Sequence, residues 1–431
     1  MGASPEKAKG FTKTEWSWML YDWANSAHST IVVAVILPII FKGLTDAAGI
    51  AKNTADAYWG YATSAATLLI AVLAPLLGTL GDFKGYKLKL FTIFAVFGMG
   101  ATAALAFAHN WLVVLLLYAL SCAGFYASNI YYDGFLVDVT TNERMDRVSS
   151  TGYGLGYIGG STIPFVIAIA LLMYGESFGI PYSTAVVIVF LMTALWWAGF
   201  TIPFWRNVRQ TNWVKPERNA LAQSFYRLAD TFRHIRQYKG LFMFILAYFF
   251  YIDGVGTIIH MATTYGDTLG LSSTELMAAL LATQVVAFPC AILYGRLAKR
   301  FGARVMIGAG IVTYMAICVL AYFTTNFTMY LALAVLVATA QGGIQALSRS
   351  YFGKLIPKKE QANEFYGFLD IFGKFATFMG PAIFGFVAMA TGQSQFGILS
   401  VMALFVIGGA IFFFGVPKEG EAKTEQSSLQ Q

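Results

Sequence analysis

The sequence predicts an all-α membrane protein with twelve transmembrane helices in two six-helix halves that are related by a parallel repeat. Three observations lead to this fold class: the composition, the number of long apolar runs, and motifs that recur at a constant offset. Of the 431 residues, 57% are hydrophobic and 12% are charged, whereas soluble domains carry about 25% charged residues. A bilayer accepts so apolar a chain when the backbone amides are paired within helices.

Apolar runs of about 20 residues are long enough to cross a bilayer as helices. Because their number is even, both chain ends are expected on the same side of the membrane. The runs lie at 17–41, 57–80, 88–108, 111–137, 152–174, 182–205, 240–264, 273–297, 303–324, 327–349, 364–390 and 394–416.

The basic residues of the connections predict which side this is. Lys42 and Lys52 lie in the loops opposite the termini. The face of the termini carries Lys84, Lys87, Lys89, Arg144, Arg147, Arg206, Arg209, Lys215, Arg218, Arg227, Arg233, Arg236, Lys239, Arg296, Lys299, Arg300, Arg304, Arg349, Lys354, Lys358 and Lys359. The positive-inside rule therefore predicts both termini in the cytoplasm and the chain in the cell (inner) membrane. It also explains the net charge of +7 without a nucleic-acid partner.

The longest cytoplasmic connection divides the chain. We expect an N-terminal half at 1–205, a linker at 206–239, a C-terminal half at 240–416 and a disordered polar tail at 417–431. Apolar residues from Leu221 to Ile235 recur at helical spacing among arginines. This stretch is either a helix on the inner membrane surface or a plain linker whose basic residues enforce topology.

The two halves share one register. An offset of 217 residues pairs Gly78, Asp82 and Gly85 with Gly295, Lys299 and Gly302, Glu143 with Glu360, Gly156 with Gly373, and Pro164 with Pro381. The paired helices run in the same direction, which is typical of a parallel repeat.

The segment GTLGDFKGYK resembles the signature loop between helices two and three of the major facilitator superfamily. The resemblance implies the major facilitator fold and a conformational gating role for Gly78, Asp82, Gly85 and Lys87. It implies that Asp82 caps the cytoplasmic N-terminus of helix eleven, where the helix dipole favours an anion. The chain departs from the pattern at Phe83, where the superfamily usually has a basic residue.

Further stretches resemble a narrower branch. YDWANSAHST, GYGLGYIGG, YIDGVGTI and QGGIQALSRSYFGKLIP are similar to segments of the family related to fungal vacuolar amino-acid effluxers. This resemblance implies efflux of amino acids or similar small metabolites. In NIYYDGFLVDV the chain has Asp133 where a small or neutral residue is expected.

Charged side chains inside membrane spans are costly and usually mark a transport path. Lys374 lies about 15 Å into helix eleven at 1.5 Å per residue. Asp370 is one turn earlier, so the two can pair. We predict substrate binding or proton coupling for this pair and for Asp133, with a purely structural salt bridge as the alternative for the pair.

Asp253 lies near the middle of helix seven, and Asp22, beside Asn25, occupies the matching position in helix one. If these acids face the space between the halves, they are candidates for proton coupling. The alternatives are a carboxylate that hydrogen-bonds to neighbouring helices for Asp253 and an interfacial position for Asp22. Asp138 is predicted to be a solvated or gate residue.

Gln341, Gln345 and Arg349 recur at i, i+4 and i+8 and form one polar stripe on helix ten. Such a stripe could bind the carboxylate of an amino acid, with Arg349 at the cytoplasmic mouth. Equally, the glutamines could hydrogen-bond between helices and Arg349 could snorkel.

These features favour a secondary active transporter that moves a small polar metabolite by alternating access with proton coupling. The alternative is an uncoupled facilitator or an exporter of a different small or amphipathic solute. An enzyme is less well supported, because the four histidines are scattered and no HExxH or GxSxG motif is present. A channel is less well supported, because the repeat is a two-fold helix bundle and not a ring around a pore. The sequence has no nucleotide-binding loop that would favour direct coupling to ATP. We expect a monomer in the lipid bilayer, with a small-molecule substrate and protons as its partners and no cofactor or metal.

Overall fold

The computed structural model describes residues 10–215 and 220–417, so all of the predicted tail except Pro417 lies outside the described residues. Within these ranges, twelve segments are long and apolar enough to span a membrane, which confirms the predicted number. Their helices begin and end close to the predicted runs.

The first helical bundle contains the crossings of the N-terminal half, and α1 and α7 each continue through a short π-helical segment. Its elements are α1 (Lys13–His28), η2 (Ser29–Ala34), α2 (Ile36–Ala47), α3 (Lys52–Gly81), α4 (Tyr86–Ala104), η3 (Leu105–Phe107), α5 (Trp111–Gly134), α6 (Leu136–Val139), α7 (Met145–Leu155), η4 (Gly156–Thr162), α8 (Ile163–Tyr174), η5 (Gly175–Phe178) and α9 (Tyr182–Asn207).

The second bundle follows a transverse helix. The remaining elements are α10 (Ala220–His234), η6 (Ile235–Gln237), α11 (Lys239–Thr268), α12 (Ser273–Phe301), α13 (Ala303–Tyr322), α14 (Phe327–Leu355), η7 (Lys359–Gln361), α15 (Ala362–Thr391) and α16 (Ser394–Gly415).

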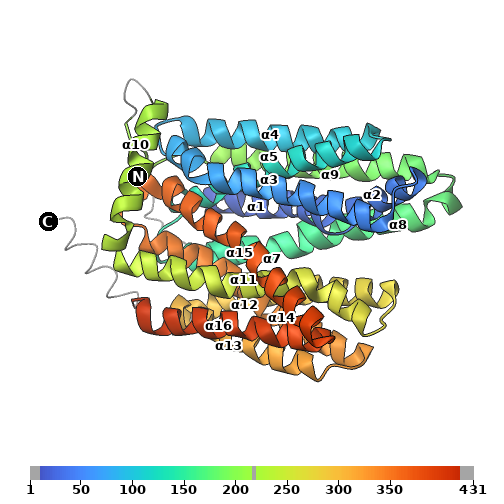
Figure 1. Cartoon of the computed structure of the whole chain (residues 1–431). Coiled ribbons are helices and arrows are strands. Elements are labelled where there is room, and N and C mark those ends of the chain that lie inside the picture. The colour runs from blue at the N-terminus through green and yellow to red at the C-terminus, as the bar shows by residue number, and fades with distance from the viewer. Residues whose placement is uncertain (1–9, 216–219, 418–431) are drawn as a thin grey trace.

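The two bundles lie side by side, with α1–α9 in blue to green and α11–α16 in yellow to red (Figure 1). Helix α10 crosses one end of the molecule, where the first turn of α1 and the last turn of α16 also lie. We call this end the termini face. The bundles meet mainly where α3 packs on α15 and where α7 packs on α12 and α14.

The repeat offset of 217 residues reappears in the packing between the bundles. A Cβ atom added to Gly78 would lie 2.3 Å from the backbone oxygen of Asn363, and one added to Gly295 would lie 3.2 Å from the backbone oxygen of Asp146. Asn363 and Asp146 are themselves 217 positions apart. Each bundle therefore places an equivalent glycine against the equivalent helix start of the other bundle.

The glycine-rich stretch GYGLGYIGG allows α7 and η4 to approach α1 closely. A Cβ atom at Gly159 would lie 1.9 Å from the ring of Trp23, so any larger residue would collide. The fifth crossing is also longer than predicted: it begins at Met145 instead of residue 152. Its first turns carry Asp146, Ser149 and Ser150, which the other bundle buries, so their polarity does not end the helix.

Small residues set the spacing between α4 and α5, as expected for helix packing in a membrane. A Cβ atom at Gly124 would lie 2.6 Å from the backbone of Gly98, whereas one at Gly100 would have no atom within 4 Å.

We expect Gly124→Val to lower the free energy of unfolding by about 2 kcal/mol through overpacking. Thermal unfolding of the purified protein measures this, with Gly100→Val as the matched control that should unfold like the parent. Equal losses in both variants would contradict the assigned packing.

Candidate functional site

The guanidinium of Arg349 joins the two bundles. Arg349 comes from α14, yet it pairs with two acids of the other bundle: Nη2 donates to Asp22 Oδ2 at 3.0 Å and Nη1 donates to Asp133 Oδ1 at 3.2 Å. Ser149 accepts from Nε at 2.9 Å through its hydroxyl and from Nη2 at 3.2 Å through its carbonyl. The sequence predictions for Arg349, Asp22 and Asp133 thus fall on one cluster.

Aromatic rings enclose this cluster. The guanidinium carbon of Arg349 lies 4.6 Å from the ring centroid of Trp18, 5.3 Å from that of Tyr132 and 4.4 Å from that of Tyr153. Trp18 and Tyr132 stack on each other with their centroids 4.5 Å apart. Such faces attract a cation and keep water from it. Arg349 is only 6% exposed, so it does not snorkel toward the termini face.

The interfacial alternative for Asp22 is wrong, because that side chain is buried against Arg349. The partner of Asp133 is Arg349, which lies 216 positions away and which the sequence around Asp133 does not indicate. The cluster carries one guanidinium for two carboxylates, and the Asp133 side chain keeps 35% of its surface exposed. Asp133 is therefore the more accessible of the two acids.

Two further predicted site residues, Gln345 of the stripe and Asn25 of α1, make contacts within their own bundle. Gln345 Nε2 donates to the carbonyl of Gln341 in its own helix at 3.2 Å. Asn25 donates to Asn129 Oδ1 at 2.7 Å, which ties α1 to α5 within one bundle. Two members of the stripe reach the other bundle: Arg349 through its ion pairs, and Gln341 through a hydrogen bond to Tyr157 of η4.

A second set of contacts continues along α7 and α14. Ser149 Oγ donates to the carbonyl of Ala346 at 2.7 Å, and Asp146 accepts from Ser350 at 2.7 Å and from Lys354 at 2.6 Å. Sequence reasoning did not single out Asp146 or Ser350. Both lie just outside the apolar runs predicted at 152–174 and 327–349, so no local pattern indicated that they would be buried.

Asp82 caps the start of α15, as the superfamily resemblance implied. Its Oδ1 accepts the backbone N–H of Asn363 at 2.9 Å and its Oδ2 accepts that of Glu364 at 3.2 Å. Gly78 allows α3 to approach this helix start, and Gly85 adopts a φ of +79°, which glycine tolerates best. A gating role for these residues remains a prediction.

The linker supplies the cation that the signature loop lacks at Phe83. Arg227 of α10 donates to Asp82 Oδ2 at 3.1 Å and to Glu364 Oε2 at 2.5 Å, and it lies above the ring of Phe83. Thr231, one turn further, also donates to Glu364. Helix α10 lies within the linker predicted at 206–239, and it holds the signature loop and α15 together.

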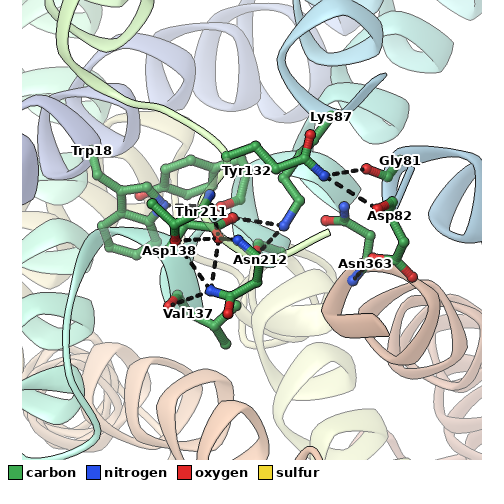
Figure 2. A network of polar contacts seen from close by, with 12 residues as sticks. Trp18, Gly81, Asp82, Lys87, Tyr132, Val137, Asp138, Thr211, Asn212 and Asn363 are labelled. Carbon is green, nitrogen blue, oxygen red and sulfur yellow. Dashed lines mark hydrogen bonds and ion pairs between the residues drawn. The ribbon is translucent and has the colours of Figure 1, made fainter. Parts of the chain in front are cut away.

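Lys87 and Asp138 form a buried ion pair near the termini face (Figure 2). Lys87 Nζ lies 2.7 Å from Asp138 Oδ2 and also donates to the carbonyl of Gly134. The other oxygen of Asp138 accepts from the backbone N–H groups of Thr211 and Asn212 at 3.0 and 2.8 Å. The prediction of a solvated Asp138 is wrong, because the linker folds back over it.

The predicted pair of Asp370 and Lys374 is present on α15. Lys374 Nζ also lies 5.0 Å from the ring centroid of Tyr126 in α5, so the pair reaches the other bundle. Lys374 is buried, whereas Asp370 is partly exposed.

Asp253 differs from its repeat-related partner Asp22. It is fully buried within its own bundle, and its Oδ1 accepts the backbone N–H of Gly380 in α15 at 2.9 Å. Its Oδ2 has no hydrogen-bond partner among the described side chains. The geometry matches the alternative of a carboxyl group that bonds to a neighbouring helix. It does not match the expectation that Asp253, like Asp22, faces the space between the two bundles.

Comparisons with known proteins agree with this architecture. A family model described as "Vacuole effluxer Atg22 like" matches residues 12–425. An uncharacterized MFS-type transporter of Bacillus subtilis (strain 168), YxiO, is 49% identical over 422 residues, which cover 97% of this chain and 98% of the relative. Autophagy-related protein 22-2 of Penicillium rubens is 25% identical over 61% of this chain, which spans 48% of that relative's length.

Solved structures share the fold at low sequence identity. The human organic anion transporter MFSD10 superposes with a TM-score of 0.75 at 14% identity, over 95% of this chain and all of the other. The major facilitator transporter FucP in its outward conformation superposes with a TM-score of 0.66 at 14% identity, over 94% of this chain and 99% of the other.

The cap at Asp82 predicts a pH dependence. Burial raises the pKa of the Asp82 carboxyl to about 7, although Arg227 and Lys87 act in the opposite direction. The pKa of Asp in an unfolded chain is about 4, so the folded protein binds this proton more tightly. We therefore expect the contribution of Asp82 to stability to be largest in acid and to be lost as the pH rises to about 7.

Thermal unfolding in detergent from about pH 5 to about pH 8 measures this contribution. The unfolding temperature of Asp82→Asn should fall less steeply with pH than that of the parent. Asp267→Asn, at an exposed site on α11, is the control and should keep the parent's profile. Parallel profiles for Asp82→Asn and the parent would contradict the prediction.

Proposed function

The chain belongs to the Atg22-like vacuole effluxer family of MFS-type transporters, and from this premise we propose that it is a secondary active transporter of the inner membrane that works by alternating access. Its solute is a small polar metabolite of the amino-acid type, which it exports in exchange for protons. The observation that carries the proposal is the Arg349 cluster, in which one bundle places a cation between two carboxylates of the other.

The contacts between the bundles support the alternating-access part of the proposal. The ion pairs of Arg349, the pair of Lys354 with Asp146 and the cap at Asp82 join the bundles toward the termini face. The ribbons of the two bundles diverge toward the opposite end (Figure 1). If the termini face is cytoplasmic, as the basic residues predict, this structure is closed toward the cytoplasm.

Opening of the termini face would separate Arg349 from its carboxylates. Breaking a buried ion pair by removing one partner costs about 3 to 5 kcal/mol, so a transporter needs a compensating ligand before it opens. A solute with both an ammonium and a carboxylate group supplies the charges that both bundles then lack. This complementarity, together with the description of the family as effluxers, supports amino-acid-like solutes.

Two acids support proton coupling. An uncompensated carboxylate in an apolar interior is costly, so Asp253 is most stable with a proton while it remains buried against α15. Asp133 is the accessible acid of a cluster with more carboxylates than cations. Protonation of Asp133 would weaken its pairing with Arg349 and so favour separation of the bundles.

Proteoliposomes provide the direct test of this function. Vesicles with purified protein and an imposed pH gradient are presented with a panel of labelled amino acids and with acidification as a second readout. We expect gradient-driven flux of at least one zwitterionic amino acid together with movement of protons. Flux that ignores the gradient would favour the uncoupled facilitator, and absence of flux for every zwitterion would contradict the proposed solute class.

Arg349 should be essential for both stability and transport. We expect Arg349→Gln to lower the free energy of unfolding by about 3 kcal/mol, because it leaves two acids unpaired in the interior. Addition of Asp22→Asn and Asp133→Asn should recover much of this stability but no transport. Recovery of transport by the triple variant would show that the cluster serves only as a brace.

Asp253→Asn should abolish gradient-driven transport but retain exchange of labelled for unlabelled solute, because exchange needs no net proton movement. The matched control on the same helix is Asp267→Asn, which should transport like the parent. Unaltered gradient-driven transport by Asp253→Asn would refute its coupling role.

The pair of Asp370 and Lys374 is tested by a double-mutant cycle. Asp370→Asn and Lys374→Gln should each reduce stability by about 2 kcal/mol, because Lys374 is buried and Asp370 only partly exposed. The double variant should recover stability without recovering transport. If the double variant transports normally, the pair only braces α15.

A further inference from the structure

Helix α10 has two different faces. Its inner face carries Arg227 and Thr231, which bind Asp82 and Glu364 as described above. Ser224 and Ile235 are buried on the same side. This face therefore bridges the signature loop of one bundle and the start of α15 in the other.

The outer face of α10 combines exposed apolar and basic side chains. Leu221, Phe225 and Tyr226 are 52%, 54% and 75% exposed. Arg233 and Arg236 are also exposed, near the end of the helix. A helix with exposed rings and arginines is typical of one that lies in the headgroup region of an anionic bilayer.

The position of α10 suits such a contact. It runs across the ends of the membrane-spanning helices, so its axis lies along the plane of the bilayer (Figure 1). The acidic residue of its exposed surface, Asp230, lies 3.0 Å from His234. Lys239, at the start of α11, adds a further exposed positive charge. The surface is therefore complementary to negative headgroups.

We propose that the outer face of α10 binds anionic phospholipid headgroups and that this binding stabilises the closed termini face through Arg227. Lipid that binds the docked helix favours the state in which the inner face of α10 holds Asp82 and Glu364. This goes beyond the proposed transport function, because it makes lipid composition a determinant of how readily the termini face opens.

Hydrogen exchange of the full-length protein in nanodiscs tests the proposal. One preparation contains phosphatidylcholine alone, and the other also contains phosphatidylglycerol. Each basic residue near an anionic surface strengthens binding about fivefold. In the anionic discs we expect exchange to slow about tenfold or more for the backbone amides of 220–234. The same slowing is expected for the backbone amides of Asn363 and Glu364, which donate hydrogen bonds to Asp82.

Variants separate headgroup recognition from general effects of the lipid. Arg233→Gln with Arg236→Gln should remove the difference between the two discs. Lys299→Gln with Arg300→Gln, an exposed basic pair in the last turn of α12, should preserve it. The measurement uses no solute and no gradient, so its outcome is independent of whether the proposed transport is correct.

Three results would overturn the proposal. They are equal exchange of α10 in both discs, slower exchange of α10 without slower exchange at Asn363 and Glu364, and a lipid response that persists in the Arg233 and Arg236 double variant.

Discussion

The interaction on which the rest of the structure depends is the burial of a single guanidinium between acids of the opposite bundle. Arg349 cannot leave Asp22 and Asp133 without exposing charges of opposite sign on the two bundles. In an apolar interior such charges are unstable unless water, protons or a solute replace the lost partners. The same contact therefore closes the termini face in this structure and makes its opening conditional on a ligand.

The two halves keep the geometry of a repeat but differ in their chemistry. Gly78 and Gly295 pack against equivalent helix starts, yet Asp82 caps α15 whereas its counterpart Lys299 is exposed. Asp22 likewise bridges the bundles, while Asp253 bonds to the backbone of its own bundle. A symmetric scaffold thus carries an asymmetric set of charges, and the linker helix α10 adds a further contact on one side through Arg227.

Features that depend on nearby residues could be predicted from the sequence. The twelve crossings follow from apolar run length, and the pair of Asp370 and Lys374 follows from helical spacing. The cap at Asp82 was predicted from the resemblance of GTLGDFKGYK to the signature loop of the superfamily. The partners of Arg349 could not be derived, because Asp22 lies 327 positions away in the chain and the contact exists only once the bundles have packed. The burial of Asp138 was missed for the same reason, since the linker that covers it has no pattern that indicates where it folds back.

Access of water to the layer beneath Arg349 tests the central claim most directly. Ala346 is fully buried beside Ser149, so a cysteine there, in a chain whose native cysteines are replaced, reports whether the termini face is open. The measurement uses membrane vesicles in which the termini face of the protein is exposed to the reagent. There, a membrane-impermeant maleimide should label Ala346→Cys slowly when Arg349 is present and much faster when Arg349→Gln is added. Equal labelling rates in both backgrounds would contradict the account that Arg349 holds this face closed.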